Sequence, residues 1–152
     1  MKTAKAFGII DVIARIPPTE PEQIAASKHN VIDLIFDLPR PPSVNRLTAR
    51  LGNKSNIVQR WIRAADARLM SNPHEWRRIS AGKITGPFVI DITWHREDFG
   101  RFDVDNPIKC LMDYLQRIAL IENDKLCRVM TVAFGTAPDG CRVRLRAWDW
   151  QS

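Results

Sequence analysis

Cysteine is scarce in this sequence, and the three that occur, Cys110, Cys127 and Cys141, form no closely spaced pair. A zinc knuckle takes its ligands from such pairs, so the spacing argues against one. An odd number of cysteines at core or strand positions indicates reduced thiols. We therefore expect a cytoplasmic protein.

The sequence also lacks a long uninterrupted apolar run. The apolar stretch near the N-terminus is broken by Asp11 and Arg15, and no small-residue cleavage site follows it. These features predict neither a signal peptide nor a membrane span. Apolar residues still make up 45% of the 152 residues, enough for one compact domain with a core.

Basic residues outnumber acidic ones, 23 to 17, for a net charge of +6. The acidic residues gather in the centre of the sequence and the basic residues on either side. One basic run contains no acid and consists of Arg46, Arg50, Lys54, Arg60 and Arg63. Such a run is often a solvated helix face, but it also suits contacts with DNA phosphates.

The central stretch begins with two aspartates, Asp103 and Asp105, which would point to the same side of an extended segment. Asn106 is a candidate helix N-cap, and Pro107 suits the first helical position. The helical apolar positions that follow are Ile108, Leu111, Met112, Leu115, Ile118 and Ala119.

We expect this helix to end near Leu120 and the chain to return Asp124 to the end where Asp103 and Asp105 lie. Three carboxylates at one point, with Lys109 a turn away, would suit phosphodiester chemistry with a divalent metal. Asp-x-Asp before a helix is more often a cap and a solvated turn. A calcium loop is disfavoured because its glycine and final glutamate are absent.

The whole pattern resembles the RusA-type Holliday junction resolvases. The resemblance rests on Asp103-Val104-Asp105-Asn106, Lys109, Asp113, Leu115 and Asn123-Asp124, and on a Pro-Pro-Ser-x-Asn-Arg loop at 41–46. It covers about residues 32–150. Asn123 departs from the family pattern, which commonly has a second acid there.

The resemblance implies a homodimeric endonuclease that resolves four-way DNA junctions in recombination and repair. Asp103, Asp105 and Asp124 would hold Mg²⁺, with Mn²⁺ as a substitute. Lys109 would neutralise charge developing on the phosphate, and Asp113 would orient Lys109 or complete the acidic cluster. Asn45, with the basic run from Arg46 to Arg63, would contact DNA. Two other classes stay open: a non-catalytic DNA-binding module and a hydrolase of small phosphorylated molecules.

The remaining patterns predict an α+β fold, a small mixed sheet with helices packed on one face, as in the RusA-like family. Alternating apolar residues predict strands at 31–38 and 88–95, and further strands are expected at 129–134 and 143–150. Pro138-Asp139-Gly140 predicts a hairpin turn between the last two. A helix is expected from about 53 to 69.

Residues 1–30 form a predicted N-terminal helical extension to the endonuclease domain at 31–152, with short helices at about 3–15 and 19–28. We expect these helices to pack on the domain or on a partner subunit, in preference to forming a helix-turn-helix, because no recognition-helix pattern is visible.

Two acids and one row of side chains each allow a structural and a functional interpretation. Glu97 and Asp98 are interpreted as solvated acids. In the last strand, three arginines and two tryptophans occupy one face: Arg142, Arg144, Arg146, Trp148 and Trp150. This face is either an exposed basic platform or, as we prefer, one covered by a helix.

Overall fold

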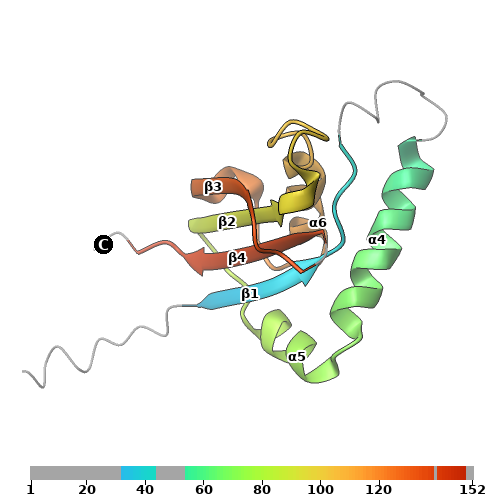
Figure 1. The fold of residues 1–152 in the computed structure, drawn as a ribbon. Helices are drawn as coiled ribbons and strands as arrows, with labels where there is room; N and C mark the ends of the chain where they lie inside the picture. Colours follow the sequence, from blue (N-terminus) through green and yellow to red (C-terminus); the bar gives the residue numbers. More distant parts are fainter. Residues whose placement is uncertain (1–31, 44–53, 139, 150–152) are drawn as a thin grey trace, which may run out of the picture. The chain divides into compact units, whose positions relative to one another are not determined.

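The computed structural model of the chain describes residues 32–43, 54–138 and 140–149 (Figure 1). The predicted extension at 1–30 lies outside these residues, as do Asn45, Arg46, Arg50 and Trp150. In chain order, the elements are β1 (Asp33–Leu38), α4 (Lys54–Met70), α5 (Pro73–Ala81), β2 (Phe88–His95), η1 (Arg96–Asp98), α6 (Ile108–Arg117), η2 (Asp124–Leu126), β3 (Cys127–Gly135) and β4 (Cys141–Ala147).

The four strands form one mixed sheet in the order β1-β4-β2-β3. β4 runs antiparallel to both β1 and β2, whereas β2 and β3 are parallel. The α+β prediction is confirmed. The predicted hairpin is wrong, because β4 inserts between β1 and β2 and does not pair with β3 (Figure 1).

One face of the sheet is buried under the helices. Alternate strand residues such as Phe36, Ile92 and Leu145 share a single core with Trp61 of α4 and Leu111 of α6. The apolar residues that alternate along β1 and β2, from which these strands were predicted, are therefore the ones that are buried. The helices pack on one face of the sheet, as expected.

Helix α6 ends earlier than predicted. Its last residue is Arg117, and Ala119 has a positive φ of 60°. Ala119 is also exposed, so it is not part of the buried stripe. Leu120 and Ile121 are buried just beyond this turn, and Ile121 forms a parallel bridge with Ile84. The chain thus reaches β3 from the end of the sheet where β2 starts.

The opposite face of the sheet carries arginine–aspartate pairs. Arg142 forms two hydrogen bonds with Asp37, at 2.9 and 3.1 Å, and Arg146 contacts Asp91 at 2.7 Å. Arg144 forms a similar fork with Asp33 at 2.9 and 2.6 Å, and this hydrogen bond lowers the pKa of Asp33.

The preferred interpretation of this face, burial under a helix, is wrong for the described elements. The helices share the core of the other face, and the three arginines keep 35–44% of their side chains exposed. The arginines are neutralised by aspartates of neighbouring strands, so they do not form a free basic platform either.

Candidate functional site

The segment 102–107, here called the acidic turn, is held against the sheet by its apolar residues. The indole Nε1 of Trp94 donates a hydrogen bond of 2.8 Å to the carbonyl oxygen of Val104. The Phe102 ring packs against Trp94 and Phe134, with centroids 6.0 and 5.6 Å apart. The turn is therefore fixed to the ends of β2 and β3.

Asp103 and Asp105 both lie exposed on the acidic turn. The segment is a turn rather than the predicted extended run, with hydrogen bonds from Asn106 N to Asp103 O and from Ile108 N to Asp105 O, at 3.1 and 3.0 Å. Neither carboxylate forms an ion pair with any lysine or arginine whose position is described.

The predicted cap at Asn106 is wrong. Helix α6 starts at Ile108, with Pro107 in the N-cap position and no side-chain capping bond. The Asn106 amide instead donates to Asp103 Oδ2 at 3.2 Å, which stiffens the turn. The reason is that the chain is already turning at Val104, so Asn106 faces back toward Asp103.

Lys109 and Asp113 lie one turn apart on the exposed face of α6. The Lys109 Nζ contacts Asp113 Oδ1 at 3.3 Å, and the two side chains are 71% and 58% exposed. An exposed pair at this spacing contributes only a few tenths of a kcal/mol. The contact fits the prediction that Asp113 orients Lys109, whose catalytic role stays a prediction.

Asp124 lies at the other end of the sheet from the acidic turn. It opens η2, which Asn123 caps by accepting from Lys125 N at 2.9 Å, and Cys127 then pairs with Phe88 at the start of β2. The acidic turn contacts Trp94 at the end of β2. Six residue steps of about 3.3 Å, from Phe88 to Trp94, separate these ends by roughly 20 Å.

The structure therefore places Asp103 and Asp105 on one short turn but does not return Asp124 to them within one subunit. In the described ranges, no three His, Cys, Asp or Glu side chains are grouped closely enough to hold a metal ion. The two turn carboxylates nevertheless fit Mg²⁺ chemically, because they are exposed oxygen donors without a paired cation.

The predicted DNA contacts are described only in part. Arg60 and Arg63 lie on the exposed face of α4, opposite the buried Trp61, Ile62 and Ala65. Lys54 is the first residue of α4. The predicted helix is confirmed, and Arg60 and Arg63 face outward from it.

Sequence reasoning missed one charged cluster beside the acidic turn. Asp98 is only 8% exposed, and its Oδ1 contacts both Arg40 and, at 3.5 Å, Arg101. The Arg40 guanidinium also lies over the Phe102 ring, 5.4 Å from the centroid. The interpretation of Asp98 as a solvated acid is wrong, because Arg40, 58 residues earlier, lies against it.

Neither a protein-family model nor a curated protein sequence matches this chain. None of the helices in the described ranges combines the length and hydrophobicity that a membrane span requires.

Proposed function

We propose that this chain is a RusA-like, Mg²⁺-dependent endonuclease that cuts four-way DNA junctions. The observation that carries the proposal is the acidic turn. Its apolar residues tie it to β2 and β3, while Asp103 and Asp105 stay exposed and uncompensated by the described basic residues. Two exposed carboxylates on one short turn, with no described basic residue paired to either, would attract a divalent metal ion.

Asp103 and Asp105 would hold the metal, which when bound would activate water and stabilise charge on the phosphate. Lys109, one turn into α6, would neutralise the developing charge on a phosphate oxygen. Its contact with Asp113 limits the positions that the long lysine side chain samples. The exposed face of α4, with Arg60 and Arg63, would contact DNA arms.

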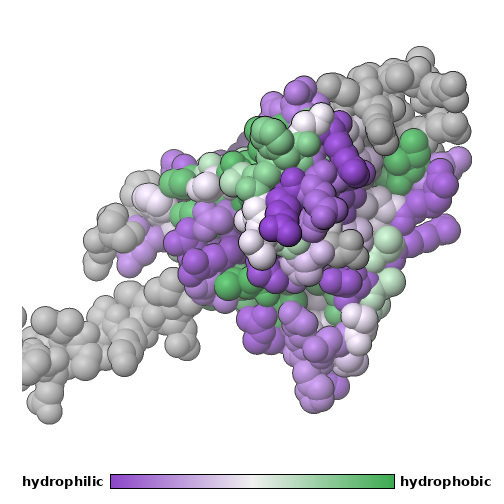
Figure 2. Space-filling view, in the orientation of Figure 1, coloured by the Kyte–Doolittle hydropathy of each residue, from purple (hydrophilic) through white to green (hydrophobic). Residues whose placement is uncertain are grey.

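The protein would act as a homodimer. Its two subunits would pair along the outer side of β3, which is an edge strand of the described sheet. Four exposed apolar residues belong to β3 or to the segments after η1: Phe99, Val104, Val129 and Met130. Hydrophobic surface is visible over this region in Figure 2. An unpaired strand edge with apolar neighbours is a favourable surface for association with a second copy.

Antiparallel pairing of two β3 strands would also complete the metal site. In such a pair, the start of one strand lies beside the end of the other. The end of β3 is where Phe134 contacts Phe102, next to Asp103. Asp124 of the partner subunit would therefore approach Asp103 and Asp105, which Asp124 of the same subunit does not reach.

The proposal is tested with a labelled four-way junction, a linear duplex of the same sequence and a mononucleotide, each with Mg²⁺ or EDTA. Metal-dependent cutting of the junction alone supports it. Tight junction binding without cutting would instead indicate a DNA-binding module. Hydrolysis of the mononucleotide in preference to the junction would indicate a small-molecule hydrolase.

A further inference from the structure

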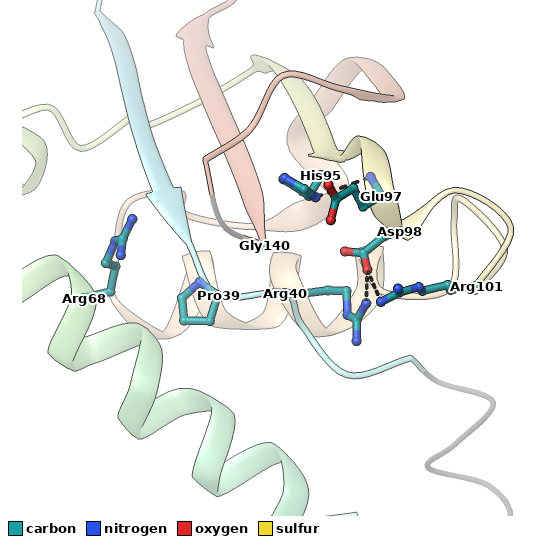
Figure 3. Close-up of a pocket in the computed structure, with 8 residues that line it drawn as sticks. All are labelled: Pro39, Arg40, Arg68, His95, Glu97, Asp98, Arg101 and Gly140. Carbon is teal, nitrogen blue, oxygen red and sulfur yellow. Dashed lines mark hydrogen bonds and ion pairs between the residues drawn. The ribbon is translucent and has the colours of Figure 1, made fainter.

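A pocket of about 450 Å³ lies beside the acidic turn (Figure 3). Its wall is formed by the segment after β1, by η1 and its flanks, by α4 and by the turn before β4. Figure 3 shows Arg40 and Arg101 approaching Asp98 from opposite sides, with His95 and Glu97 nearby. Neither Asp103 nor Asp105 lines this pocket, so it is distinct from the proposed metal site.

The lining is polar and carries an excess of positive charge. Three arginines, Arg40, Arg68 and Arg101, line the pocket together with two acids, Glu97 and Asp98, which leaves a formal charge of +1. Asp98 contacts one nitrogen each of Arg40 and Arg101. A guanidinium has five N–H donors, so most of their donors remain for another acceptor.

The buried carboxylate also fixes where these guanidinium groups lie. Asp98 is 8% exposed, whereas the Arg40 and Arg101 side chains are 37% and 67% exposed. The contacts with Asp98 therefore hold both cations at the pocket without hiding them. Side chains ordered in advance lose less conformational entropy when they bind an anion.

We propose that this pocket binds a phosphodiester group of the DNA substrate, next to the one held at the acidic turn. The proposal rests on the endonuclease function above. Arginine matches the oxygens of a phosphate with parallel N–H donors. Arg40 lies against Phe102, the residue before Asp103, so a phosphate bound here would sit close to the cleavage position. The pocket would thus position the strand that is cut.

The test is junction binding in EDTA, measured from about 50 to 200 mM salt, for Arg101→Gln and for the control Arg77→Gln. Arg77 is exposed on α5 and does not line the pocket. Loss of one phosphate contact should reduce the slope of log K against log salt by about 0.9 and weaken binding roughly fivefold to tenfold. Arg77→Gln should change neither quantity.

Arg101→Lys, which keeps the charge, should restore most of the salt slope, and thermal unfolding should show that all three variants fold. Equal effects of Arg101→Gln and Arg77→Gln on the salt slope would overturn the proposal. So would a mononucleotide that binds the wild type but not Arg101→Gln, with DNA binding unchanged. Because no cutting occurs in EDTA, the result stands whether or not the protein proves to be an endonuclease.

Discussion

The buried indole of Trp94 holds the carbonyl oxygen of Val104 by a hydrogen bond of 2.8 Å. Trp94 is the penultimate residue of β2, and its side chain is fully buried. Val104 stands between the two aspartates of the acidic turn. This core side chain, together with the packing of Phe102 against Phe134, therefore sets the position of Asp103 and Asp105 relative to the sheet.

Trp94→Phe should slow cleavage by more than its loss of folding stability explains. The change removes the hydrogen bond to Val104 and leaves a small cavity, at a cost of about 2–3 kcal/mol in the free energy of unfolding. At saturating junction, we expect the cleavage rate to fall at least about tenfold, because the acidic turn loses its anchor. Urea unfolding and single-turnover cleavage measure the two effects.

Trp76→Phe is the matched control, since Trp76 is half-buried on α5 and packs against the core away from the acidic turn. It should reduce stability modestly and leave the cleavage rate unchanged. If both variants slow cutting to the same extent, the anchoring role of Trp94 is wrong.

Gly140→Ala should destabilise the protein more than Gly100→Ala. Both glycines have positive φ, 86° and 78°, which costs an alanine about 1 kcal/mol. A Cβ at Gly140 would also lie 2.5 Å from Leu38 O and 2.7 Å from Pro39 C, whereas one at Gly100 would meet nothing within 4 Å.

The close approach at Gly140 should add about 1–3 kcal/mol to the loss in the free energy of unfolding, measured with urea. Because Arg40 follows Pro39 directly, the same change should weaken junction binding. Equal stability of the two variants would show that the turn before β4 does not pack against the segment after β1 as described.

Local patterns in the sequence predicted much of this fold. Strand β2 was expected at 88–95, where it is found, because alternating residues such as Ile90 and Ile92 must face one core. The insertion of β4 between β1 and β2 could not be predicted from the turn at Gly140. That turn looks the same whether the two flanking strands pair with each other or with different partners.

Only those parts of the candidate site whose residues are close together in the sequence could be predicted. The aspartates of the acidic turn and the Lys109–Asp113 pair are close in sequence, and helix geometry accounts for the second. The burial of Asp98 depends on Arg40, and the position of Asp124 depends on the parallel register of β3. Both are long-range consequences of the topology, which spacing in the sequence does not encode.

Stability should fall as the pH rises above about 9. Burial raises the pKa of the Cys110 and Cys141 thiols from 9.0 to about 11 and about 12. Between these values the unfolded chain has lost protons that the folded chain keeps, so alkaline conditions favour unfolding. Each thiol should contribute a slope of about 1.4 kcal/mol per pH unit, starting near pH 9.

Urea unfolding from pH 8 to 10.5 measures this slope. Cys110→Ala should lower the stability at pH 8 through the lost packing but make its pH dependence shallower. An unchanged slope in Cys110→Ala would contradict the assignment of the alkaline sensitivity to this buried thiol.

Two inactive variants should restore activity when mixed. In a dimer of Asp105→Asn with Asp124→Asn, one metal site contains both substitutions and the other contains neither, provided that Asp124 acts across the interface. We expect refolded mixtures to nick one strand of the junction, although each variant alone is inactive. If Asp124 acted within its own subunit, both sites would be defective, and the mixture would stay inactive.

The most direct test of the central claim compares cutting of a labelled four-way junction by the wild type and by Asp105→Asn, in Mg²⁺ and in EDTA. The amide keeps the size of the side chain but not the negative charge that the metal requires. Glu75→Gln, which removes one charge from the exposed surface of α5, is the control. We predict Mg²⁺-dependent cutting by the wild type and the control, and intact binding but no cutting by Asp105→Asn. Cutting by Asp105→Asn at the wild-type rate would contradict the account.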